Sequence, residues 1–147
     1  GVKIRQVYDI EHGYYREIMQ YRFPFVEDMV TAFKTGDYSQ AFQTLEENHS
    51  QEAEICCKFL LKYVLYSLTA AQEVGYNIHS ADDVMATGFN WCPPLAVVEA
   101  FGGTEKFIHL CEDRLKENWL EEINLIRLKE TIESSRYDYR RFIKAKR

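Results

Sequence analysis

The stretch SQEAEICCKFLLKYVLYSLTAAQEV, residues 50–74, is the longest helical pattern in the chain and its most apolar. Apolar side chains recur along it at intervals of three and four, and few positions are left for polar ones. A helix that is apolar around most of its circumference belongs in a protein interior. We therefore predict a central, buried helix over residues 50–74, with Gly75 at its end.

Three helices are predicted before it. Apolar side chains at helical spacing on both sides of Gly13 indicate the first. Pro24 begins a second, amphipathic helix that ends at Gly36, and Asp37 caps a third over residues 38–48, so that the two form a helical hairpin. The side chains that define the first helix are Val7, Tyr8, Tyr14, Tyr15, Ile18 and Met19.

The helical pattern continues after the central helix. Four further helices are expected, over residues 81–87, 95–101, 104–116 and 120–135. Ser80 and Thr104 are the N-cap candidates of the first and the third of these. In the last helix, Ile123, Ile126 and Ile132 are predicted to point inward.

No segment shows sustained alternation of apolar and polar side chains, so no sheet is predicted. With 147 residues, 46% of them hydrophobic and 28% charged, the chain fits one all-α, compact multi-helix domain. Within it we distinguish N-terminal helices and a helical hairpin (1–49), a core helical domain (50–135) and a basic C-terminal tail (136–147). The sequence has neither a membrane-length apolar run nor a signal-peptide core, which favours a soluble, cytoplasmic protein.

Charge is distributed unevenly. Lys and Arg number 18 and Asp and Glu 23, a net charge of −5, but the last twelve residues hold six basic side chains against one acidic one. The preceding 135 residues therefore carry −10, which argues against a general nucleic-acid-binding protein. We interpret the tail either as a solvated helix end or as a contact for phosphates or an acidic partner. Its basic residues are Arg136, Arg140, Arg141, Lys144, Lys146 and Arg147.

The sequence lacks the patterns that usually carry chemistry. Its glycines form no phosphate-binding loop, its four histidines lie too far apart in sequence for a metal pair, and no nucleophile elbow occurs. The four cysteines follow no metal spacing and are interpreted as reduced thiols, with at least one of Cys56 and Cys57 in the core. No catalytic, cofactor-binding or metal-binding residue is therefore assigned.

The unusual segment is DDVMATGFNWCPPLAVVEAFGG, residues 82–103. Asp82 and Asp83 fall in the first turn of a predicted helix, where negative charge is stabilising. The loop that follows has a composition typical of a stiff, exposed turn at an interface or a pocket mouth. Alternatively, its two aromatic side chains fill the core. The candidate surface residues are Phe89, Asn90, Trp91, Pro93 and Pro94.

Together with the long apolar helix before it, this segment resembles the C-terminal helical domain of the 3-hydroxyacyl-CoA dehydrogenase family. That family has an acidic segment, then a Gly-(Phe/Ala)-(Asn/Gly)-(Trp/Tyr) motif and a Gly-Pro-Phe turn. Residues 88–91, Gly-Phe-Asn-Trp, match this motif, particularly in the second helical repeat of the two-repeat members. Pro93 stands where the family has Gly, and Leu95 and Glu99 stand where it has Phe and Asp.

The resemblance implies a fold like the helical C-terminal domains of 6-phosphogluconate and 3-hydroxyacyl-CoA dehydrogenases. It also implies an NAD-dependent oxidation of a 3-hydroxyacyl-CoA to a 3-ketoacyl-CoA in fatty-acid β-oxidation. NAD and a His general base oriented by a Glu then belong to a nicotinamide-binding domain of the same polypeptide, which this chain lacks. The helical domain closes over the acyl-CoA cleft and makes the contact of a homodimer.

For the candidate residues, the resemblance implies a surface that meets the acyl-CoA cleft or the partner domain. Phe89 and Trp91 supply apolar area, Asn90 supplies an orienting hydrogen bond, and Pro93 and Pro94 stiffen the loop. Neither nucleic acid nor a membrane span is expected.

Two other functions stay open. The first is a non-enzymatic all-α protein-interaction module, in which the aromatic loop is the contact and the basic tail guides an acidic partner. This function accounts for the lack of catalytic motifs without a missing domain. The second is a free-standing enzyme of unfamiliar type.

Overall fold

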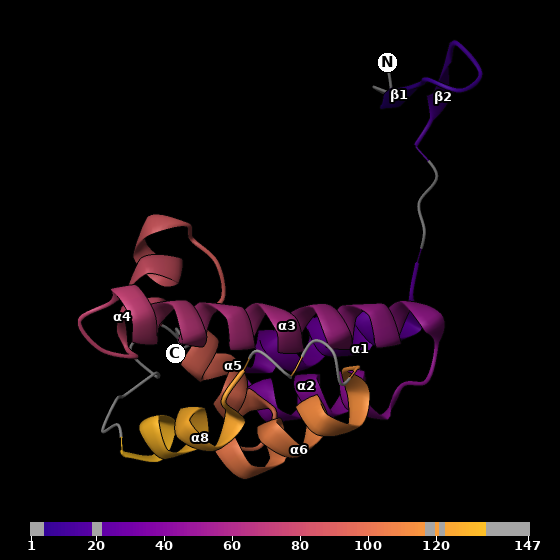
Figure 1. The fold of residues 1–147 in the computed structure, drawn as a ribbon. Helices are drawn as coiled ribbons and strands as arrows, with labels where there is room; N and C mark the ends of the chain where they lie inside the picture. Colours follow the sequence, from indigo (N-terminus) through magenta and orange to yellow (C-terminus); the bar gives the residue numbers. More distant parts are fainter. Residues whose placement is uncertain (1–4, 19–21, 117–119, 121–122, 135–147) are drawn as a thin grey trace.

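Figure 1 shows the computed structural model of the chain, which describes residues 5–18, 22–116, 120 and 123–134. A short β-hairpin is followed by helices that pack around one of them, α3. The predominantly helical character predicted from the sequence is confirmed. The tail at 136–147 lies outside the described residues, so what we predict for it stays a prediction.

The first predicted helix is wrong. Its residues form an antiparallel hairpin of β1 (Gln6–Asp9) and β2 (Tyr14–Glu17), in which Tyr8 pairs with Tyr15. Gly13 has φ +72° in the turn, a conformation that glycine adopts without strain. Most side chains of both strands are exposed. Because neither strand has a buried face, the sequence lacks the apolar–polar alternation that predicts a strand. In Figure 1 the hairpin stands off the helical body.

The helical hairpin that follows is confirmed. Helix α1 (Pro24–Thr35) begins at its proline and ends at Gly36, whose φ of +80° turns the chain. Asp37 then caps α2 (Tyr38–Glu47), because its carboxylate accepts a hydrogen bond from the Gln40 N–H at 2.9 Å.

Helix α3 (Gln51–Val74) begins where the Ser50 hydroxyl accepts a hydrogen bond from the Ala53 N–H. It contacts α2, α4, α5 and α6, so its central position is confirmed. The prediction that α3 is buried on nearly all sides is wrong. One face of the helix packs in the core, while another exposes large apolar side chains to water. These exposed side chains are Ile55, Phe59, Tyr66 and Val74.

The segment after α3 is less regular than predicted. In place of one helix over 81–87 there is a single turn, α4 (Ser80–Asp83), followed by a π-helical turn, η1 (Val84–Gly88). The turn widens because the Phe89 N–H donates to the Val84 carbonyl five residues earlier, at 3.2 Å. Helix α5 (Pro94–Ala100) follows the loop and is buried along almost its whole length.

Two predicted caps are wrong. Ser80 and Thr104 are the first residues of their helices, and the N-cap positions belong to His79 and Gly103. Gly103 has φ +95°, so the chain needs the backbone freedom of glycine at that position more than it needs a capping hydroxyl. Helix α6 (Thr104–Arg114) then runs back along the body and ends two residues earlier than predicted.

Helix α8 (Leu125–Ser134) packs on α6. Ile132 is buried and Ile123 packs against the core, as predicted, but Ile126 is 75% exposed. The core lies between α3 and the helices on its inner side. Among the helices described, none combines the length and the apolar character that a membrane crossing requires.

Candidate functional site

The loop between η1 and α5 presents its aromatic side chains at the surface. Phe89 is 70% exposed and Trp91 is 50% exposed, so the alternative in which both fill the core is wrong. Asn90 has φ +51°, a left-handed conformation that asparagine tolerates better than most residues. The Trp91 N–H donates to the Met85 carbonyl at 2.8 Å and joins the loop to the π-helical turn.

The two prolines differ in position. Pro93 is partly buried and has extended backbone at the N-cap of α5. Pro94 is the first residue of α5 and is buried in the interior. Its prediction as a surface residue is therefore corrected: Pro94 anchors the loop, because the helix start it forms is enclosed by the core.

Asp82 holds the loop from below. Its side chain is fully buried, and its Oδ1 accepts a hydrogen bond from the Leu95 N–H at 2.7 Å. The chain enters α5 through Trp-Cys-Pro-Pro, residues 91–94, which include no side chain able to cap the helix. The cap therefore comes from thirteen residues earlier. The missing local cap is the signal in the sequence that could have revealed this positioning role of Asp82.

A second contact fastens the loop to α3. The Tyr63 hydroxyl donates to the Cys92 carbonyl at 2.5 Å. Burial raises the pKa of Tyr63, so the hydroxyl stays protonated and remains a donor at neutral pH. The loop is thus held at one end by Asp82 and near its middle by Tyr63, which leaves Phe89 and Trp91 in fixed positions on the surface.

The buried thiols are not poised for nucleophilic chemistry. Burial raises the pKa of Cys57 to about 11 and that of Cys111 to about 12, and it also raises the pKa of Cys92. These thiols are therefore protonated at neutral pH. Cys56 differs from its neighbour, because it is a free and exposed thiol.

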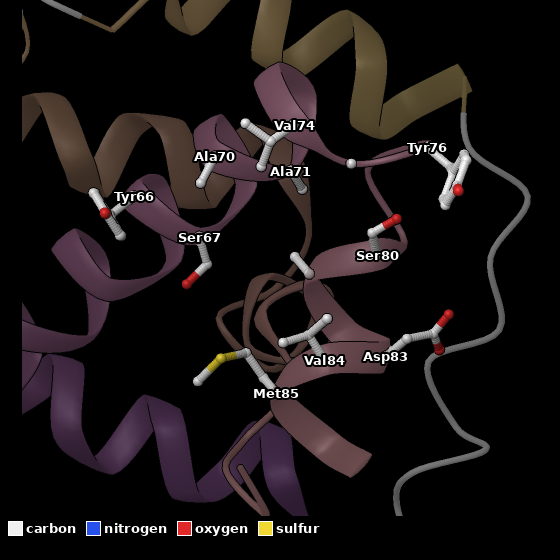
Figure 2. A pocket seen from close by; sticks show the side chains of 12 residues that line it. Tyr66, Ser67, Ala70, Ala71, Val74, Tyr76, Ser80, Asp83, Val84 and Met85 are labelled. Carbon is white, nitrogen blue, oxygen red and sulfur yellow. The ribbon is translucent and has the colours of Figure 1, made fainter. Parts of the chain in front are cut away.

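An apolar pocket of about 500 Å³ lies between the C-terminal half of α3 and the α4–η1 segment (Figure 2). The side chains of Val84 and Met85 lie across it from those of Tyr66 and Ala70. The lining residues with polar side-chain atoms are Tyr66, Ser67, Tyr76, Ser80 and Asp83. The pocket has the size and the mostly apolar lining of small-molecule sites, and π-helical turns such as its η1 wall are frequent at functional sites.

An apolar groove of about 480 Å³ lies on the other side of the loop, between α1 and the N-terminal half of α3. Trp91 closes one part of it. Every described residue that lines the groove is apolar or a thiol, and several are exposed, including Ile55 and Phe59. The lining residues are Phe25, Val26, Met29, Val30, Phe33, Leu45, Ile55, Cys56, Phe59, Leu60 and Trp91.

The predicted site residues are thus only partly brought together. Trp91 lines the groove, whereas Phe89 and Asn90 line neither the groove nor the pocket. The sequence analysis missed both hollows. The pocket joins α3 to the turns that follow it directly, and the groove joins α3 to α1 and to Trp91. In both, helical periodicity does not show whether an apolar side chain is buried or lines a cavity. Residues 84–91 border both, since Val84 and Met85 face the pocket and Trp91 faces the groove.

Within the described residues, no group of three or more His, Cys, Asp or Glu side chains is arranged to hold a metal ion. The site therefore offers apolar binding surface and a few hydroxyl and carboxylate groups. Comparison with known protein families, with curated proteins and with solved structures finds no match to this chain.

Proposed function

We propose that this chain is the C-terminal helical, substrate-side and dimerisation domain of an NAD-dependent 3-hydroxyacyl-CoA dehydrogenase of fatty-acid β-oxidation. The observation that carries the proposal is the apolar pocket. Its walls include two of the segments on which the resemblance to that family rests, the long helix α3 and the acidic segment that begins at Asp82. The pocket then receives the acyl chain of the substrate.

The chemistry of the pocket favours an acyl thioester over a free fatty acid. The carboxylate of Asp83 lies at its edge and repels another carboxylate, whereas the thioester group is uncharged and the negative charges of CoA lie on its phosphates, away from the acyl chain. The hydroxyls of Ser67 and Ser80 are hydrogen-bond donors for a carbonyl or hydroxyl oxygen. Apolar side chains such as Val84 and Met85 bury the hydrocarbon part and exclude water from it.

In this proposal the chain binds and orients, and another domain does the redox chemistry. NAD, and the histidine and glutamate that move the proton, belong to a nicotinamide-binding domain that packs against this one. The exposed Phe89 side chain, on a loop fixed by Asp82 and Tyr63, belongs to the surface that meets that domain.

The test is a calorimetric titration of the chain with acetoacetyl-CoA, and with free CoA for comparison. We expect the ester to bind more tightly than CoA, and a separately expressed nicotinamide-binding domain of the family to oxidise NADH faster when the chain is added. NADH is oxidised to NAD while the 3-keto group takes up hydride and a proton. No binding of the ester and no stimulation would refute the proposal.

Ala70→Trp sharpens the test, because it fills the pocket from α3. We expect acetoacetyl-CoA affinity to fall at least tenfold. Ile126→Trp adds the same side chain at an exposed site on α8 and serves as the control. Thermal melts of both variants separate a filled pocket from a destabilised fold.

The alternative function, a non-enzymatic protein-interaction module, is favoured by the groove. Its lining is apolar throughout, which suits a protein surface better than a substrate with polar groups. Binding of a protein partner at the groove, together with failure of every CoA ester to bind, would favour this function over the dehydrogenase.

A further inference from the structure

We propose that the N-terminal hairpin of one copy of this chain inserts into the apolar groove of a second copy, and that the Tyr8–Tyr15 pair is the anchor. Residues 5–18 are called the β-arm below. The proposal goes beyond the dehydrogenase function and does not depend on it, because it rests only on the β-arm and the groove.

The β-arm exposes more apolar surface than an isolated hairpin can sustain. Ile10 is 90% exposed and Tyr15 is 65% exposed, and Tyr8 and Tyr14 are more than half exposed. A two-stranded hairpin alone is marginally stable in water, because it has too little surface to bury. The arm therefore gains stability when one of its faces is covered.

The pairing register shows which face is suited to burial. Tyr8 lies opposite Tyr15, and their rings meet edge to face with centroids 5.2 Å apart. Gln6 and Glu17 share this face, but they form the pair farthest from the turn, so the two rings can be buried while this polar pair stays in water. The opposite face carries Val7 and Tyr14 together with the ion pair of Asp9 and Arg16, at 2.8 Å, and the ion pair favours water. The tyrosine face presents two adjacent rings whose hydroxyls can stay at the rim of a cavity.

The groove complements this face. It is apolar throughout, and its volume of about 480 Å³ is in the range that accommodates bulky groups. Each tyrosine side chain buries about 150–250 Å². Only a half to two thirds of each tyrosine is exposed before docking, so four tyrosines in a symmetric pair bury roughly 350–600 Å², and the groove walls lose a comparable area. The sum, roughly 700–1,200 Å², is the size of a weak or transient interface.

The path of the chain favours a second copy over the arm's own groove. Phe23 has extended backbone (φ −112°, ψ 116°), and Pro24 after it disfavours the helical conformation that would turn the chain back. Phe23 is also packed against the core. The chain therefore leaves α1 in an extended direction, and Figure 1 shows the arm away from its own groove-forming helices. A two-fold axis then lets each arm occupy the other copy's groove.

The exposed thiol of Cys56 in the groove provides a direct test. In Ile10→Cys, which changes a side chain that is 90% exposed and leaves both anchor tyrosines in place, mild oxidation should link the new thiol to Cys56 of the second copy and give a species of twice 17.4 kDa on a non-reducing gel. Adding Cys56→Ser should abolish this species, since Cys57 and Cys111 are buried and the partly exposed Cys92 is replaced by Ser in both proteins. A link between the introduced thiol and Cys56 of the same chain, which leaves the monomer mass unchanged, would overturn the proposal.

A groove variant guards against a failure of the hairpin itself to form. Phe59→Lys places a charge in the groove at a side chain that is already 59% exposed, so the helix should persist. We expect the dissociation constant of the dimer, measured by sedimentation, to be at least tenfold higher than in the unmodified chain. Ile126→Lys is the matched control and should leave the dimer intact. An unmodified chain that sediments as a monomer, or a Phe59→Lys dimer of undiminished strength, would overturn the proposal.

Discussion

Helix α3 borders two apolar hollows of nearly equal volume whose walls differ in chemistry. The pocket at its C-terminal half includes hydroxyls, a carboxylate and a π-helical turn, whereas the groove at its N-terminal half is apolar throughout. A few polar groups among apolar walls orient a small molecule, while a uniformly apolar groove binds any large apolar side chain that fills it. In our proposals, one end of the helix therefore binds a small molecule and the other end contacts a protein.

The segment between the pocket and the groove should be destabilised most by a change at Asp82. Asp82→Ala removes the carboxylate that caps α5 and leaves the Leu95 N–H buried. Hydrogen bonds to charged groups contribute roughly 1.5–3 kcal/mol, so we expect a loss of about 3 kcal/mol in the free energy of unfolding. Urea denaturation measures it. Asp83→Ala, at an exposed neighbour, is the control and should cost less than about 1 kcal/mol. Equal losses in both variants would contradict the capping role.

Tyr63→Phe should affect the groove more than the pocket. The variant keeps the ring and removes the hydroxyl that donates to the Cys92 carbonyl. One neutral hydrogen bond is worth about 1 kcal/mol, so stability should fall by about that amount. Because Cys92 precedes Pro93 and adjoins Trp91, the groove should loosen more than the pocket. Acrylamide quenching of Trp91 fluorescence, with Trp119 replaced by Phe in both proteins, should therefore increase. Unchanged quenching would contradict the role of this hydrogen bond.

Acidification gives the smallest expected effect, and it is measured at the β-arm. The hydrogen bond from the His12 backbone N–H, followed by those from the His12 and Arg16 side chains, lowers the pKa of Asp9 below its ordinary 3.8. Since the folded-state pKa is depressed, the stabilisation is complete well above pH 3.8 and is lost as pH falls through the lower value. Amide NMR signals of β1 and β2 should lose dispersion there. Asp9→Asn should remove this pH dependence; an unchanged profile would contradict the role of Asp9.

The sequence predicted the features that local chemistry determines. Asp37 caps the helix that follows it and Gly36 ends the helix that precedes it, because each acts within a few residues of itself. Features that depend on distant segments were missed. Asp82 caps a helix thirteen residues later. The π-helical turn is local but was missed too, because a helical pattern does not show that the Phe89 N–H bonds to the carbonyl five residues earlier. The hairpin was missed because it has no buried face to leave a pattern.

The candidate site shows the same division. Composition predicted a stiff, exposed aromatic loop, and Phe89 and Trp91 are exposed as that interpretation requires. The burial of Pro94 was not predicted, because it depends on how α5 packs against α3. The two hollows could not be predicted either, since apolar side chains of α3 give the same helical periodicity whether they are buried or line a cavity.

The separation of the two hollows is tested most directly by crossing two variants with two measurements. Ala70→Trp in the pocket and Phe59→Lys in the groove are each examined by acetoacetyl-CoA titration and by sedimentation. We predict that Ala70→Trp loses at least tenfold in ester affinity and keeps the dimer, and that Phe59→Lys loses the dimer and keeps ester affinity. If either variant changes both measurements, or neither measurement changes, the account of two separate sites on α3 is contradicted.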